Sequence, residues 1–227
     1  MRRIWRWLVF ALVAIVAIGV AGWYFFLKSD PAPRAAIKET PTVAATPSAL
    51  DGTWTVKPGN HDNFVGYRVT EKLIANIAQS TATGRTDNVT GTMTIDGSTV
   101  KDITVTADLR DLTSDNNFRD NRIRREGLES DQFPQAKFVL TSPITLTATP
   151  QVGETITTQA TGDFTLHGVT KSVTITLQGR FDGTKVQVVG NLPIVFGDYG
   201  ITAPTAPAVA SVDDHGEMEL QLFFAKS

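Results

Sequence analysis

Alternation of apolar and polar side chains at every second residue is the feature of this 227-residue sequence that most restricts its fold. The pattern is clearest in three runs after residue 50, with apolar positions Ile103, Val105, Ala107 and Leu109, then Val173, Ile175 and Leu177, and last Met218, Leu220, Leu222 and Phe224. A two-residue period places one face of a strand on a core and the other face in solvent. The sequence therefore predicts an all-β domain.

Pairs of turn-forming residues separate such runs: Asp96-Gly97, His167-Gly168 and Asp182-Gly183. Short turns of this composition join neighbouring strands as hairpins, so we expect an antiparallel meander. Many even strands favour a closed or nearly closed barrel, because closure leaves no exposed sheet edge. A β-sandwich is the alternative that the same pattern allows.

Two segments depart from the alternation and predict short helices. In residues 71–79 the apolar residues Leu73, Ile74, Ile77 and Ala78 recur at helical spacing. The second segment follows the capping residues Ser114-Asp115, is mostly polar and ends at Gly127. The expected fold is thus an antiparallel β-barrel with one or two short helices.

An apolar run near the N-terminus predicts a single transmembrane helix ahead of the barrel. Residues 8–27 carry no charge, and about 20 apolar residues are needed to cross a hydrocarbon core as a helix. Arg2, Arg3 and Arg6 precede the run, so the positive-inside tendency puts residues 1–7 in the cytoplasm as an N-terminal tail. We expect a single-pass protein of the cell membrane with its C-terminal domain extracytoplasmic.

A cleaved secretory signal is the alternative interpretation of this run. Gly19-Val20-Ala21 has the small-x-small form of a cleavage site, and cleavage there would leave a secreted or periplasmic protein. The new N-terminus would then be an exposed apolar segment beginning at Gly22, and the run is longer than a usual signal core. Both points favour the anchor.

Residues 28–49 are rich in proline, alanine and threonine and have too few apolar residues for a core. Their prolines favour extended conformations. We therefore expect a semi-stiff linker that holds the folded domain, residues 50–227, away from the lipid surface.

The composition and motifs of the chain argue against several functional classes. The chain has no cysteine, which excludes disulfides, thiolate metal sites and cysteine nucleophiles. A net charge of −2 gives no electrostatic footprint for nucleic acid. The three histidines, His61, His167 and His215, have no metal-binding spacing, and no nucleophile elbow or phosphate loop is present. We expect no enzyme activity, no metal and no cofactor.

Several short motifs occur in a fixed order along the domain: Trp54-Thr-Val, Phe64-Val-Gly-Tyr-Arg-Val69, Val89-Thr-Gly91, Arg119-Asp120, Phe133-Pro134-x-Ala136-x-Phe138, Gly162-x-Phe-x-Leu-His-Gly-Val-Thr-Lys171 and Asp198-Tyr-Gly200. Together they resemble the YceI-like polyisoprenoid-binding family, from about Leu50 to the C-terminus. The resemblance implies a lipocalin-like barrel whose interior holds a long isoprenoid or other amphiphilic chain. It departs at Lys57-Pro58-Gly59-Asn60-His61 and at Thr70-Glu71, so polar ligand contacts there are not transferred.

The resemblance also implies candidate ligand-binding residues. The candidates for a lipid tunnel are Phe64, Tyr67, Val69, Phe118, Phe133, Phe138 and Phe164. Ordinary core packing is the competing interpretation of these aromatic residues, and sequence does not decide whether the barrel is hollow or filled.

Arg119 and His167 are candidates for contact with the ligand's head group. An arginine fork suits the phosphate of a prenyl diphosphate, but Arg119 beside Asp120 is equally consistent with an ion pair that clamps a helix to the barrel. His167 also fits a turn residue whose ring bonds to nearby backbone. The proline-containing stretch 201–207 predicts a loop that either covers one mouth of the barrel or is an inert excursion.

Three functions follow from these expectations. The leading one is binding, storage or transport of a polyprenyl or quinone-type lipid at the outer face of the cytoplasmic membrane, with the membrane and the lipid as partners and a homodimer as a further state that the family allows. The second is an interaction domain with a filled core, acting in envelope stress or assembly. The third is an enzyme that acts on lipids.

Overall fold

The structure, a computed structural model, describes residues 10–19, 22, 30–39, 41–44, 50–73, 79–204 and 209–227. The described part contains thirteen strands: β1 (Gly52–Val56), β2 (Phe64–Leu73), β3 (Gln79–Thr86), β4 (Val89–Asp96), β5 (Thr99–Asp108), β6 (Thr113–Ser114), β7 (Gln135–Leu140), β8 (Ile144–Thr145), β9 (Thr155–Leu166), β10 (Val169–Phe181), β11 (Lys185–Val195), β12 (Val209–Val212) and β13 (His215–Lys226). The all-β prediction is confirmed.

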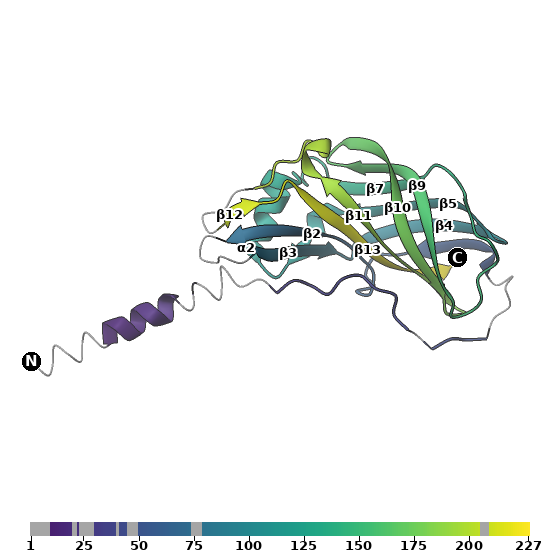
Figure 1. The fold of residues 1–227 in the computed structure, drawn as a ribbon, viewed down its shortest axis with the longest axis horizontal. Helices are drawn as coiled ribbons and strands as arrows, with labels where there is room; N and C mark the ends of the chain where they lie inside the picture. Colours follow the sequence, from purple (N-terminus) through teal and green to yellow (C-terminus); the bar gives the residue numbers. More distant parts are fainter. Residues whose placement is uncertain are drawn as a thin grey trace, which may run out of the picture.

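The sheet closes on itself as an antiparallel barrel (Figure 1). β1 and β2 pair with successive parts of β13, and with successive parts of the continuous segment formed by β3 and β4. The pair β1 and β2, and the pair β3 and β4, each act as one long strand. Counted in this way the barrel has eight strands, and we call each of them a stave. The expected barrel is therefore correct, and the sandwich alternative is wrong.

All three turns expected from the sequence join adjacent staves. Gly97 lies between β4 and β5, and Asp182-Gly183 lies between β10 and β11. In the hairpin from β9 to β10, His167 has φ 51° and Gly168 has φ 75°. Positive φ at both central positions matches the right-handed twist of the strands, which explains the meander.

The second predicted helix is confirmed, with a different cap. It consists of α2 (Asn117–Arg122) and a π-helical turn, η3 (Ile123–Gly127). The side chain of Asn116, rather than Ser114 or Asp115, accepts hydrogen bonds from the backbone of Phe118 and Arg119. Two short 3-10 helices, η2 (Leu109–Asp111) and η4 (Phe196–Tyr199), complete the described helices of the domain.

The first predicted helix, over residues 71–79, is wrong at both of its described ends. Residues 71–73 belong to β2, and Gln79 begins β3. Residues 74–78 lie outside the described part of the chain. Glu71 and Lys72 pair with β3 on one side and β12 on the other, so long-range pairing overrides the local spacing of apolar residues.

The barrel has a solid half away from α2, which we call the plugged half. There Trp54, Phe181 and Phe224 fill the interior, each at most 3% exposed. The rings of Trp54 and Phe181 meet edge to face with centroids 5.8 Å apart, and Trp54 Nε1 donates to the Leu50 carbonyl at 2.8 Å. Burial of these large rings stabilises closure of the sheet.

Part of the predicted membrane anchor is described. Residues 10–19 and 22 are helical, and large apolar side chains along the helix are exposed, including Phe10 and Ile18. Among the described residues, no helix has both the length and the apolar character needed to span a bilayer. The remaining residues of the predicted anchor 8–27, and the tail 1–7, lie outside the described part.

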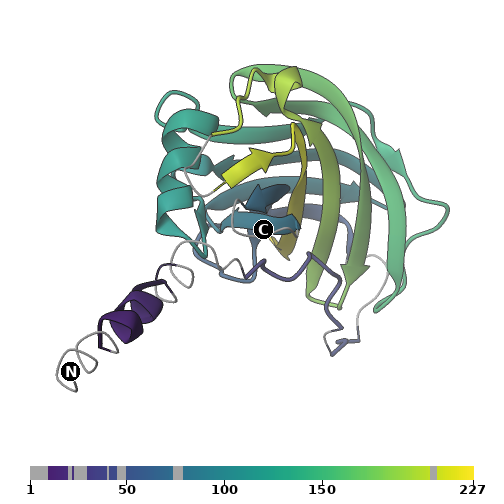
Figure 2. The same cartoon turned by 60° about the vertical axis from the view of Figure 1, so that its left-hand side comes forward.

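The described residues of the predicted linker contact the barrel. These residues, 30–39 and 41–44, run extended along the outer wall of the barrel, and we call them the strap (Figure 2). Polar side chains on β2, β3, β11 and β13 bond to its backbone. The predicted linker is thus extended, and it is docked on the barrel, because the barrel wall supplies the hydrogen-bond partners that an extended chain needs.

Candidate functional site

The half of the barrel next to α2 encloses a cavity of about 720 Å³. Its wall is formed by the inward faces of β2, β3, β7, β9, β11 and β13, and its mouth by α2, η3, β12 and the loop after η4. This volume is within the range of sites that hold one small molecule. The interior is therefore not filled throughout, and the filled-core alternative is wrong on this point.

Small side chains explain why this half is hollow. Ala82 on β3 and Ala136 on β7 line the cavity and are 1% and 5% exposed. The equivalent space in the plugged half is occupied by the rings of Trp54 and Phe181. A methyl group in place of an aromatic ring leaves room in this half of the barrel.

One part of the cavity wall carries a buried ion pair. Arg119 of α2 donates from Nη2 to Glu71 Oε1 of β2 at 2.9 Å, and from Nη1 to Asp115 Oδ1 at 2.6 Å. Burial opposes the charge of Arg119, but the carboxylates of Glu71 and Asp115 outweigh it and raise the pKa of the guanidinium. The pair clamps α2 onto the barrel, as one interpretation of the sequence expected, although Asp120 is not the partner.

Asp120 of the same helix forms a different contact. Its Oδ1 accepts from the Ser114 hydroxyl at 2.5 Å, and its side chain is buried. This bond ties α2 to β6, the short strand that leads into it. Two separate sets of carboxylate contacts, those of Arg119 and that of Asp120, therefore hold α2 at the cavity mouth.

Tyr67 lines the cavity and carries a buried hydroxyl. Its oxygen is buried and has no hydrogen-bond partner among the described residues. Burial is the main cause that raises the pKa of Tyr67 above its ordinary value, so the group stays protonated. A buried hydroxyl without a partner is costly, so Tyr67 is held here by the packing of its ring rather than by a hydrogen bond.

Four of the seven predicted tunnel residues line the main cavity: Tyr67, Val69, Phe118 and Phe164. Phe118 projects from α2 at the mouth and is 66% exposed. Phe138 lines a smaller cavity of about 50 Å³ deeper in the barrel, which Phe164 also lines.

Phe64 and Phe133 do not line the cavity, and the expectation that they would is wrong. Phe64 faces the outer wall, where Arg85 lies over its ring at 3.7 Å from the centroid. The odd-numbered positions Val65, Tyr67 and Val69 face inward, so Phe64 must face outward. Phe133 packs instead on the ring of His167, with centroids 4.4 Å apart.

His167 is a turn residue, as the local interpretation predicted. Its Nδ1 lies 3.0 Å from the Tyr199 carbonyl, and its Nε2 lies 3.0 Å from Glu129 Oε2. The ring joins the hairpin from β9 to β10 to η4 and to the loop after η3, and it does not line the cavity. The structure thus gives no position for His167 beside a head group in this cavity.

The cavity mouth includes residues that the motifs did not indicate. Leu109 and Ile123 come from η2 and η3, Leu112 and Leu128 follow these two helices directly, and Ile201, Ala203 and Pro204 come from the loop after η4. The described part of the predicted loop 201–207 therefore borders the mouth, which agrees with the covering role weighed from the sequence. The prolines of residues 201–207 predict this loop, but no local sequence pattern indicates which part of the barrel it contacts.

A family model for the YceI-like domain matches residues 54–224. The chain belongs to the YceI-like family. The matched region of this YceI-like chain includes every stave of the barrel and the cavity.

Known proteins resemble the YceI-like chain in sequence or in fold. A UPF0312 protein from Shewanella denitrificans is 31% identical over 148 residues, which is 61% of this chain and 74% of the relative. A polyisoprenoid-binding domain from Saccharophagus degradans, implicated in plant cell wall breakdown, superposes with a TM-score of 0.60 at 18% identity, covering 77% of this chain and 98% of that domain.

Two further solved structures share the architecture. BcnA from Burkholderia cenocepacia has a TM-score of 0.54 at 16% identity, with 71% of this chain and 95% of BcnA covered. The YceI protein of Campylobacter jejuni has a TM-score of 0.52 at 16% identity, with 69% and 88% covered. These likenesses show the fold of the YceI-like barrel.

Proposed function

We propose that the chain binds an isoprenoid or other long-chain amphiphilic lipid in its cavity and stores or carries it at the outer face of the cytoplasmic membrane. The observation that carries the proposal is the apolar cavity of about 720 Å³ in the half of the barrel next to α2. The solved polyisoprenoid-binding domain with the same fold supports the choice of ligand class.

The apolar wall supplies most of the affinity in this proposal. Each 100 Å² of hydrocarbon surface removed from water contributes about 2.5 kcal/mol, so a chain of several isoprene units needs few polar contacts. Arg119 lines the cavity but already bonds two carboxylates, so it acts first as a clamp.

Membrane tethering is part of the proposal. The charge-free run 8–27 and the helical residues 10–19 with exposed apolar side chains support an anchor at the N-terminus. A binder fixed beside the reservoir of its ligand meets that ligand at high effective concentration. Binding and release of an unchanged lipid, without chemical conversion, is the expected activity.

Native mass spectrometry of the full-length chain purified in mild detergent tests the binding. We expect a bound long-chain lipid of unaltered mass. Val69→Trp should abolish most of this signal, because the indole would occupy the cavity that Val69 lines. Thr92→Trp on the exposed outer face of β4 is the matched control and should keep the lipid.

Lack of lipid in both the unaltered chain and Thr92→Trp would disprove the binding proposal. A bound lipid whose mass changes with time would instead indicate an enzyme. The tether is tested separately by fractionation in the absence of detergent, where release of the intact chain into the soluble extracytoplasmic fraction would disprove it.

A further inference from the structure

The strap begins at the cavity mouth. The backbone N–H of Asp30 donates to Asp115 Oδ2 at 2.6 Å. Asp115 is the residue that also holds Arg119 in the cavity wall. The first described residue of the strap is therefore attached to the rim of the cavity.

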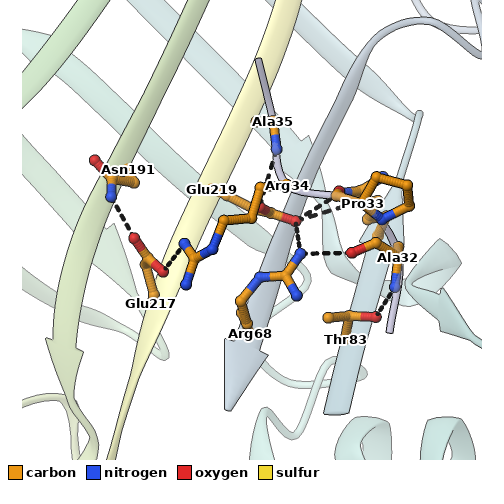
Figure 3. Close-up of polar contacts among 10 residues, drawn as sticks. Ala32, Pro33, Arg34, Ala35, Arg68, Thr83, Asn191, Glu217 and Glu219 are labelled. Carbon is orange, nitrogen blue, oxygen red and sulfur yellow. Dashed lines mark hydrogen bonds and ion pairs between the residues drawn. The ribbon is translucent and has the colours of Figure 1, made fainter. Parts of the chain in front are cut away.

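The middle of the strap docks on a polar cluster of the outer wall (Figure 3). Glu219 of β13 is only 2% exposed and accepts from Arg85 at 2.8 Å and from the backbone N–H of Ala35 at 3.3 Å. Arg68 of β2 donates to the Ala32 carbonyl at 2.6 Å. Three staves thus present side chains that match backbone groups of the strap.

Additional contacts extend the docking along the same stretch. Ala32 N–H donates to Thr83 Oγ1 at 2.9 Å, and Arg85 donates to the Pro33 carbonyl. Arg34 forms an ion pair with Glu217 at 2.6 Å. Successive strap residues are therefore held individually, which a chain resting loosely on the surface would not show.

The strap ends at the plugged half. Gln187 of β11 accepts from Lys38 N–H at 2.9 Å and donates to the Ala36 carbonyl at 3.0 Å. Val43 N–H donates to the Asp182 carbonyl in the hairpin after β10, at 2.7 Å. The direction of the strap is thus fixed, from the mouth at Asp30 to the far end of the barrel at Val43.

Docking limits how far the barrel can turn relative to the helical N-terminal segment. Asp30 is eight positions after Gly22, and at most about 3.6 Å per position gives a tether of about 29 Å from the helix to the mouth. An undocked chain from Gly22 to Leu50 would span up to about 100 Å and allow any orientation. Figure 1 shows the helical segment and α2 at the same end of the molecule.

The rim of the mouth has the chemistry of a membrane contact. Phe118 is 66% exposed on α2, and Arg122 and Arg125 lie on the same helical segment with exposed or part-exposed side chains. Residues 117–127 contain four arginines and two acidic residues. An exposed aromatic ring beside arginines suits the interface of a bilayer that contains anionic lipids.

We propose that the strap locks the barrel with its mouth against the bilayer from which the N-terminal helix emerges, so that lipid passes between bilayer and cavity without crossing water. The proposal rests on the tether of the proposed function and adds an orientation to it. The partner of the rim, which consists of Phe118, Arg122 and Arg125, is the surface of the same membrane.

The absence of cysteine in the chain allows single labels to test this orientation. Asn117→Cys places a fluorophore on α2 at the mouth, and Thr184→Cys places it on the hairpin after β10. Each full-length variant is reconstituted in vesicles of phosphatidylcholine and phosphatidylglycerol that contain a spin-labelled quencher lipid. We expect quenching at position 117 to be several-fold stronger than at position 184.

The strap is then altered without touching the barrel. Ala32→Pro, Ala35→Pro and Lys38→Pro together remove three N–H donors that bond to the wall. Quenching at the two positions should then become similar. Ala36→Pro is the matched control, because the wall bonds to the Ala36 carbonyl and the substitution should keep the difference.

Equal quenching at positions 117 and 184 in the unaltered strap would overturn the proposed orientation. A difference that survives the triple proline variant would overturn the role of the strap. Native mass spectrometry of the same samples separates these failures from failure of lipid binding, since a misassigned orientation leaves the bound lipid in place.

Discussion

The ring of Tyr67 on β2 lies over Gly84, its partner residue on β3, where a Cβ on Gly84 would fall 2.9 Å from Tyr67 Cζ and closer still to Cε1. Gly84→Ala should therefore displace the ring and its hydroxyl. We expect the free energy of unfolding to fall by about 1–3 kcal/mol, as for an overpacked core, and lipid affinity to fall as well. Urea denaturation and lipid titration measure the two effects.

Gly179→Ala on β10 is the control for this change. The nearest atom to a Cβ there is the Gln187 carbonyl oxygen at 4.0 Å, so the strand has room for it. The variant should keep both stability and lipid affinity. Unchanged affinity in Gly84→Ala would show that the Tyr67 position is not needed for binding.

Arg119→Ala should be strongly destabilising because it leaves the Glu71 carboxylate, with a side chain only 7% exposed, without its cation. Breaking a buried pair by removing one partner costs about 3–5 kcal/mol. Glu71→Leu combined with Arg119→Met should recover most of that loss, since both charges are then replaced by apolar groups. Chemical denaturation of the unaltered chain and of these two variants measures the loss and its recovery.

Arg110→Ala removes an exposed arginine that pairs with Asp108 and should change stability little. A loss in Arg119→Ala no larger than in Arg110→Ala would contradict the clamp. The Arg119 variants also test the head-group hypothesis. Unaltered affinity of a well-folded Glu71→Leu/Arg119→Met variant for a prenyl diphosphate would exclude it.

His167→Asn should lower stability without weakening lipid binding. Asparagine tolerates the φ of 51° at this position, but its side chain is too short to reach both the Tyr199 carbonyl and Glu129. We expect a loss of about 1–3 kcal/mol from the unpaired groups. A fall in affinity greater than the loss of folded protein explains would place His167 in the binding site.

Docking of the strap should weaken in acid. The hydrogen bond from Lys38 lowers the pKa of Asp62 below 3.8. Burial acts to raise the pKa of Glu217, but bonds from Asn191 and Arg34 outweigh it and hold the pKa below 4.5. Carboxylates with lowered pKa stabilise the docked strap above these ordinary values, and that contribution is lost as the pH falls through the lowered ones.

Hydrogen exchange of the Ala35 and Lys38 amides, corrected for the intrinsic rate at each pH, measures this effect. Protection should be constant above about pH 5 and decline below about pH 4. Replacing Arg34 and Lys38 by glutamine should remove most of the pH dependence. The same acid-induced decline in that double variant would show that other groups control docking.

The barrel was predictable because its signals are local. Alternation in β5, β10 and β13 and the turn pairs at Asp96, His167 and Asp182 need no knowledge of the rest of the chain. The outward position of Phe64 was also available, since Phe64 and Tyr67 are three residues apart and cannot share a face of one strand.

Features that depend on distant partners were not predictable. The apolar spacing in residues 71–79 indicates a helix, yet pairing with β3 and β12 keeps the described part of this segment extended. The strap has the composition of a free linker, and its docking requires Glu219, Arg68 and Arg85 to meet on one wall. No local pattern in residues 28–49 indicates that this segment docks on the barrel wall.

The contrast between the plugged half and the hollow half has a consequence for how such a chain can diverge. Closure of the sheet depends on rings such as Trp54 and Phe181, which no ligand reaches. Side chains that border the cavity, such as the part-exposed Val69 and the exposed Phe118, face open space. Substitutions at these positions can change which lipid the cavity accepts with little loss of folding stability, so the same barrel can bind different lipids in different relatives.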